Sequence, residues 1–178
     1  GRIICFNLNT INYETPSFDW LLPTGSQIKS SPAVDDMGFI YVTTMDGKLL
    51  KINDEGFSSE IVWQINTQQT IEASPILDGN GNIIIASVEG VINKISPEGE
   101  NVWTNINENH QIIGTPAFDN NNNLFTALIF EETDSTETDS GLIMRTNTFT
   151  SLRGYDADGI IFTKTNVPGA IESSLLIN

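Results

Sequence analysis

The sequence predicts an all-β protein assembled from repeated four-stranded antiparallel sheets, and three observations support this. A pattern of one hydroxyl residue, one proline and two apolar residues recurs at 31–34, 74–77 and 115–118, at intervals of 43 and 41 residues. Each of the three tryptophans of the chain precedes one of these prolines by 12 or 13 residues. No apolar period typical of a helix reaches ten residues. A helix-free repeat of this length is typical of the blades of a β-propeller.

Strand-like and turn-like segments alternate inside each repeat. Aromatic and β-branched runs at 39–44, 83–88 and 124–130 predict strands, and the runs 48–52 and 91–95 predict the strands that follow two of them. Short segments rich in Asp, Asn and Gly separate the runs. These residues accept a positive φ or bond their own backbone, so we expect tight turns.

One position of the repeat always holds a large aromatic residue. It is filled by Trp20, Trp63, Trp103 and, in a fourth copy, Phe162, which precedes the related pattern at 173–176. A large ring at the same place in every blade packs well against the neighbouring blade, and an indole can offer its N–H to a partner there. We therefore predict a structural docking role for these four residues.

With the strands placed, the sequence resembles the pyrroloquinoline-quinone-like (PQQ-like) β-propeller repeats, which belong to the superfamily of the quinoprotein alcohol dehydrogenases. The family blade reads SPAV, then an acidic turn and a strand, then D-G-x-L, and finally a tryptophan. Residues 31–42, 46–49 and 96–103 follow these three parts. The resemblance covers nearly the whole chain and implies four strands per blade, with SPAV on the inner strand A and the tryptophan on the outer strand D.

By that scheme the chain is a partial propeller of about three and a half blades. Residues 1–22 give strands C and D of one blade, residues 29–66, 71–107 and 112–165 give three full blades, and residues 171–178 give the first strand of the next. Family propellers usually have seven or eight blades, so we expect this chain to be a segment of a longer protein. Further blades of that protein are then one class of partner.

Composition and charge exclude several classes of function. The chain of 178 residues carries 23 acidic and 8 basic side chains, a formal net charge of −15, which is the wrong sign for nonspecific nucleic-acid binding. No apolar run approaches the roughly 20 residues that a transmembrane helix needs. The single cysteine, Cys5, excludes an intrachain disulfide and a metal site made of several cysteines.

The residues do not predict an enzyme. The resemblance implies that an active quinoprotein dehydrogenase would hold calcium through Glu, Asn and Asp, use a catalytic Asp and stack a tryptophan on the quinone. The three tryptophans here already fill docking positions, so we expect neither PQQ nor calcium and no catalytic residue in this chain. The only histidine, His110, has no nucleophile motif beside it, which favours a solvated loop residue.

One turn has a weak metal-loop pattern. Asp78, Asn80, Asn82 and Glu89 match positions 1, 3, 5 and 12 of a calcium-binding EF-hand loop. However, the predicted strand 83–88 lies between them, and at about 3.3 Å per residue it carries Glu89 roughly 20 Å from Asp78. The first three residues stay weak metal candidates, and a hairpin turn is the favoured interpretation.

The third repeat carries an insertion of about 16 residues, and segment 131–140 within it has five acids and no base. We expect a solvated, mobile acidic loop between strands B and C, on the same face as the loops 67–70 and 107–111. A contact with a partner or a cation is the alternative. The predicted interaction face comprises His110, Glu131, Glu132, Asp134, Glu137 and Asp139.

Two functional hypotheses follow. In the first, the chain is a noncatalytic propeller scaffold that binds a protein, another macromolecule or a ligand, within a secreted, periplasmic or surface protein. In the second, it is part of a quinoprotein dehydrogenase or another enzyme whose active residues lie outside this chain. The resemblance implies a periplasmic, extracellular or cell-surface location for either.

Overall fold

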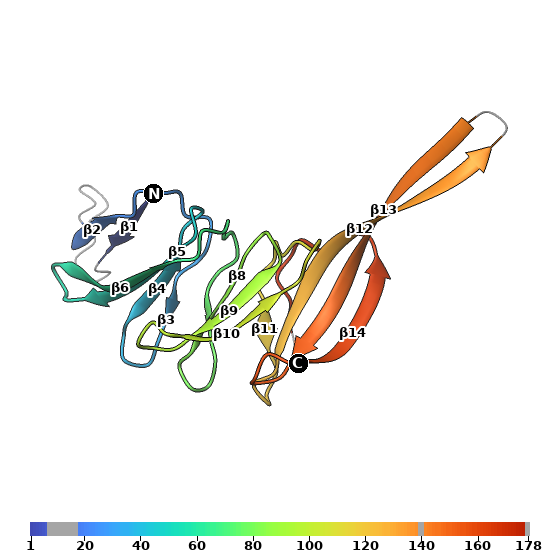
Figure 1. Cartoon of the computed structure of the whole chain (residues 1–178). Coiled ribbons are helices and arrows are strands. Elements are labelled where there is room, and N and C mark those ends of the chain that lie inside the picture. The colour runs from blue at the N-terminus through green and yellow to red at the C-terminus, as the bar shows by residue number, and fades with distance from the viewer. Residues whose placement is uncertain (7–17, 139–140, 177–178) are drawn as a thin grey trace.

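A computed structural model describes residues 1–6, 18–138 and 141–176 of the chain. The described residues form four antiparallel sheets and contain no helix. The sheets stand side by side in chain order (Figure 1), and we call them the first to the fourth blade.

The first blade pairs β1 (Arg2–Cys5) with β2 (Trp20–Pro23). The second contains β3 (Ala33–Val34), β4 (Ile40–Thr43), β5 (Lys48–Asp54) and β6 (Ser59–Asn66). The third contains β7 (Ile76–Leu77), β8 (Ile83–Ala86), β9 (Val91–Ile95) and β10 (Asn101–Ile106). The fourth contains β11 (Ala117–Phe118), β12 (Leu124–Thr138), β13 (Gly141–Tyr155) and β14 (Ile161–Pro168).

Each of the last three blades is a meander in which every strand pairs with the next one along the chain. This order is that of strands A to D in the predicted blade. The predicted fold class, an all-β partial propeller of four-stranded antiparallel blades, is therefore confirmed.

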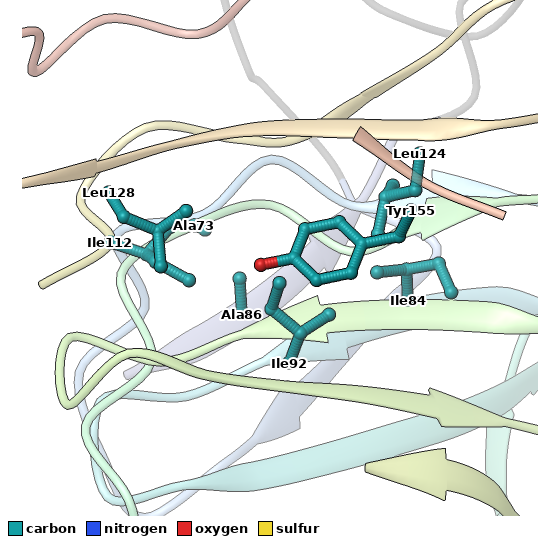
Figure 2. Close-up of a cluster of buried hydrophobic side chains, with 8 residues drawn as sticks. All are labelled: Ala73, Ile84, Ala86, Ile92, Ile112, Leu124, Leu128 and Tyr155. Carbon is teal, nitrogen blue, oxygen red and sulfur yellow. The ribbon is translucent and has the colours of Figure 1, made fainter. Parts of the chain in front are cut away.

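The hydrophobic core lies between the blades rather than inside any one of them. Three buried clusters join successive blades, and Figure 2 shows the cluster between the third and fourth, which consists of Ala73, Ile84, Ala86, Ile92, Ile112, Leu124, Leu128 and Tyr155. A middle strand is covered on both faces, so Ile83–Ala86 is buried at every position and reads as a continuous apolar run. Each fully buried isoleucine contributes roughly 1.5–3 kcal/mol, so interfaces between blades dominate the stability.

The turns between the second and third strands lie on one face, together with the loops between blades. The N–H of Thr67 donates to the carbonyl of Gly47 (2.8 Å), and that of Asn107 donates to the carbonyl of Gly90 (3.0 Å). Both glycines have a positive φ, and a Cβ on Gly90 would lie 2.5 Å from the carbonyl oxygen of His110. Glycine is needed there because the following loop crosses directly over the turn.

The acidic insertion is not a loop, so that prediction was wrong. Strands β12 and β13 stay paired from Leu124↔Tyr155 to Thr138↔Gly141 and project beyond the blades as a two-stranded arm (Figure 1), which we call the ribbon, residues 131–138 and 141–148. Acidic composition favoured a loop, but the segment is also rich in threonine, and the facing strand 142–149 carries one charge, on Arg145. Pairing across the ribbon satisfies the backbone groups that the two strands turn toward each other.

The hydroxyl residue of the repeated pattern links neighbouring blades. The N–H of Ser31 donates to Oγ of Ser74 (2.9 Å), and the N–H of Ser74 donates to Oγ1 of Thr115 (3.1 Å). The N–H of Thr115 in turn donates to Oγ of Ser174 (3.4 Å). Residues 171–176 thus continue the series but carry no strand assignment, and 177–178 lie outside the described residues.

Candidate functional site

The three tryptophans contact the following blade at the turn between its third and fourth strands. The indole N–H of Trp63 donates to the carbonyl of Pro97 (3.0 Å), and that of Trp103 donates to the carbonyl of Ala157 (3.0 Å). Trp20 instead donates to the Asp54 carboxylate (2.9 Å).

Two lysines that the sequence interpretation overlooked share these acceptors. Lys51 lies opposite Trp63 and Lys94 opposite Trp103, and each is only 6% exposed. Lys51 Nζ donates to the Pro97 carbonyl (2.9 Å), and Lys94 Nζ donates to the Ala157 carbonyl (3.3 Å). We call this arrangement of one lysine, one tryptophan and one turn carbonyl the Lys–Trp clasp. Its signal was present in the sequence, because the two lysines are 43 residues apart and each precedes an isoleucine.

Phe162 differs from the tryptophans that it was grouped with. In the fourth blade Thr163 lies opposite Gly154, and Phe162 is the unpaired bulge residue beside it. Its ring is 51% exposed and meets Phe125 edge-on at 5.7 Å, rather than a further blade within the described residues. The same bulge occurs in the second and third blades, where Val62 and Val102 occupy it and the tryptophan follows, whereas in the fourth blade the aromatic residue itself occupies the bulge. Counting residues to the next repeat could not reveal this one-residue shift.

The weak metal candidates form a turn. Asp78 Oδ1 accepts the N–H groups of Asn80 (2.8 Å) and Asn82 (2.9 Å), while Oδ2 accepts the Asn82 side-chain amide (2.8 Å) and Lys94 Nζ (2.9 Å). Burial raises the pKa of Asp78, but the bonds from Lys94 and Asn82 outweigh it and leave the pKa below its usual value. Among the described residues no three His, Cys, Asp or Glu side chains are placed to share a metal ion.

A cleft of about 650 Å³ opens at the root of the ribbon, on the predicted interaction face. Its lining consists of Val88 and Glu89 before β9, residues 109–111 of the loop between blades, which we call the floor, and Ile129, Phe130 and Glu131 of β12. The backbones of Gln111 and Ile129 exchange two hydrogen bonds (2.7 and 2.8 Å), which fix the floor against the ribbon.

The structure brings together only part of the predicted interaction face. His110 and Glu131 line the cleft. Glu132, Asp134 and Glu137 lie further along the ribbon and are exposed. Asp139 lies outside the described residues.

His110 is held in one tautomer by its partners. Its Nδ1 lies 2.7 Å from the carbonyl of Glu108, which only accepts, and its Nε2 lies 2.8 Å from Nη2 of Arg153, which only donates. His110 is therefore neutral with the proton on Nδ1. Burial lowers its pKa, as do the charges of Arg153 and Lys164, and these effects outweigh the Glu108 carbonyl, which raises it.

A buried polar network supports the histidine. Arg153 is 8% exposed and donates from Nε to Ser151 (3.1 Å) and from Nη1 to the side-chain carbonyl of Asn107. The hydroxyl of Tyr155 donates to the same Asn107 oxygen (3.1 Å). Sequence reasoning missed Arg153, Asn107 and Tyr155, because partners 46 and 48 residues apart show no local pattern.

Aromatic rings and carboxylates define what the cleft presents. The ring of Phe130 lies 5.0 Å from that of His110 and 5.6 Å from that of Phe149, centre to centre. Both oxygens of Glu89 accept the N–H of Thr70 (3.0 and 3.1 Å), and although burial raises the pKa of Glu89, these bonds hold it below its usual value. The residues that line the cleft therefore include one aromatic residue, Phe130, which we call its aromatic wall, and two with carboxylates, Glu89 and Glu131, a combination suited to binding.

Comparison with protein-family models finds none that matches, and comparison with curated proteins finds no relative. Among solved structures, the chain is similar to BamB from Moraxella catarrhalis, with 12% identity, a TM-score of 0.47 and coverage of 91% of this chain and 81% of that one. It is also similar to a protein of unknown function from Bacteroides caccae, with 13% identity, a TM-score of 0.49 and coverage of 87% and 67%. At these identities neither similarity assigns a family or an activity. No helix among the described residues is long and apolar enough to cross a membrane.

Proposed function

We propose that the chain is part of a noncatalytic β-propeller scaffold that binds another macromolecule through the face carrying the cleft and the ribbon. The observation that carries the proposal is the ribbon itself. Its described residues 131–138 are all exposed, and Leu142, Ile143 and Met144 on the facing strand are large apolar side chains that are also exposed. A paired two-stranded arm with apolar side chains and free edges is a surface that another chain can cover.

The proposal also covers cofactors and cellular location. The three tryptophans are engaged between blades, and Asp78 is engaged by its own turn and Lys94, so we propose that neither PQQ nor calcium is required. The resemblance to PQQ-like repeats supports a periplasmic, extracellular or surface location.

Site-specific photocrosslinking tests the binding face. A photoreactive residue at Leu142, which is 65% exposed on the ribbon, should join the chain to one macromolecule of the source cell envelope. The matched control is a photoreactive residue at Met37, which is 74% exposed in the turn between β3 and β4, at the opposite end of the strands. Equal products from both positions would contradict the proposed face. Quinone spectra or dye reduction after addition of PQQ and calcium would contradict the noncatalytic role.

A further inference from the structure

We propose that the cleft at the root of the ribbon binds an arginine side chain of a partner protein, with the guanidinium between Glu89 and Glu131 and against the ring of Phe130. The inference rests on the proposed function, because it takes the ribbon face as the binding face. It adds the chemistry of the partner.

The two acidic residues come from different elements and line the same cleft. Glu89 belongs to the turn between β8 and β9, whereas Glu131 belongs to β12, and both line the same cleft of about 650 Å³. No salt bridge within the described residues uses either carboxylate. A cation between them would therefore not have to displace an internal cation, although the N–H of Thr70 already donates to both oxygens of Glu89.

Two cations act on His110, of which Lys164 is exposed and Arg153 is held by internal partners. Arg153 is buried beneath the floor, where Ser151, Asn107 and the ring of His110 accept its donors. His110 is neutral in this arrangement. Further along the ribbon, four carboxylates at 131, 132, 134 and 137 stand against Arg145 alone.

The aromatic wall favours arginine over lysine. A guanidinium is planar, so it can stack on a ring and form two parallel bonds to a carboxylate, whereas an ammonium is a compact and strongly hydrated charge. The ring of Phe130, which contacts those of His110 and Phe149, belongs to a residue that lines the same cleft as Glu131. Attraction between a cation and an aromatic face adds to the attraction of the carboxylates.

An NMR titration of the whole chain tests the proposal. The probe is an acetylated and amidated peptide, Gly-Ser-Gly-Arg-Gly-Ser-Gly, compared with peptides in which lysine, glutamine or glutamate replaces the arginine. We expect saturable shifts of the His110 and Phe130 ring signals, with the arginine peptide binding at least about fivefold more tightly than the glutamine peptide. The preference should weaken as salt is raised, because the charges are at the surface.

The double variant Glu89→Gln, Glu131→Gln should remove the preference for arginine. Glutamine at 89 keeps an oxygen to accept the N–H of Thr70, so the turn stays intact. Glu60→Gln with Glu100→Gln is the control, because it removes the same charge from exposed sites on or beside the outer strands β6 and β10. Equal binding of the arginine and glutamine peptides, or an unchanged preference in the cleft variant, would overturn the proposal. If the ribbon still crosslinks a macromolecule in that case, the proposed function stands and only the arginine inference fails.

Discussion

The two complete blade interfaces and the outward face of the fourth blade differ in how one repeat position is used. Between the second and third blades, and between the third and fourth, a lysine and a tryptophan donate to one turn carbonyl of the following blade. On the fourth blade, Gly154 and Thr163 occupy the paired positions, and the ring of Phe162 folds against Phe125 instead. A Cβ on Gly154 would lie 2.8 Å from the tip of that ring. A large aromatic ring thus packs near the same place in each repeat. Whether this ring also makes a polar contact depends on whether a following blade offers an acceptor.

The interface between the first and second blades is an intermediate case. Cys5 lies opposite Trp20, where the clasps have lysine, and Asp54 accepts from both side chains, at 3.7 Å from Sγ of Cys5 and 2.9 Å from Nε1 of Trp20. The bond from Trp20 lowers the pKa of Asp54 more than burial raises it, while burial and Asp54 raise the pKa of the Cys5 thiol. A side-chain carboxylate here replaces the backbone carbonyl as the acceptor.

The largest expected effect is at the clasp whose lysine also neutralises a buried carboxylate. Lys94→Met leaves Asp78 buried without its counter-charge, and we expect a loss of about 3 kcal/mol in the free energy of unfolding. Lys51→Met removes a bond to a carbonyl that Trp63 still satisfies, so about 1 kcal/mol should be lost. Urea denaturation at pH 7 measures both. Equal losses would show that the ion pair with Asp78 does not distinguish the two clasps.

A smaller effect should separate the tryptophan position in a clasp from the same position in the fourth blade. Trp63→Phe removes the indole donor and should cost about 1 kcal/mol. Thr163→Trp places an indole opposite Gly154, where the described residues provide no following blade, so the change should stay within about 0.5 kcal/mol. Thermal unfolding monitored by near-UV circular dichroism would follow both variants. A clear gain from Thr163→Trp would mean that the fourth blade makes its own clasp.

The stability of the interface between the third and fourth blades should depend on pH, because His110 lies there. Because the pKa of His110 is lowered in the folded state, the unfolded chain binds more protons as pH falls below about 6.5, and stability declines down to the folded pKa. Protonation also places a cation beside Arg153 and removes the acceptor that Nε2 provides. We expect the urea concentration at half-unfolding to decrease when the pH is lowered from 7 to 5. The decrease should be smaller in the His110→Gln variant than in the native chain. If the urea midpoint depended on pH equally in both proteins, His110 would be excluded as the cause of the pH dependence.

The smallest effect should come from the ribbon. Replacing residues 132–147 with an Asn-Gly turn between Glu131 and Thr148 removes only exposed side chains at the described positions 132–138 and 142–147, so stability should change by less than about 0.5 kcal/mol. Binding of the crosslinked partner should be lost at the same time. Loss of folding on truncation would show that the ribbon supports the fourth blade as well as a binding face.

Much of the fold was predictable because its signals are local. Aromatic and β-branched runs, such as 83–88, identified strands, and turn residues bounded them. The structure adds that Ile83–Ala86 is buried at every position. The acidic segment 131–138 was predicted as a loop from its composition alone. The prediction did not consider the strand that pairs with this segment in the structure. The lining of the cleft was predicted only in part: His110 and Glu131 were assigned to one face and both line the cleft, whereas Glu89 and Phe130, which also line it, were not assigned to that face.

The sequence by itself determined the number of blades in this chain, the order of their strands and the face on which turns and loops meet, because a repeat spacing and a two-residue periodicity are properties of the chain alone. Tertiary structure decided the partners. The lysines at 51 and 94 find carbonyls 46 and 63 residues away, and Arg153 finds Asn107 and His110 through 46 and 43 residues. Such contacts depend on how one blade lies against the next, and a buried polar group is satisfied only by what that packing brings within reach.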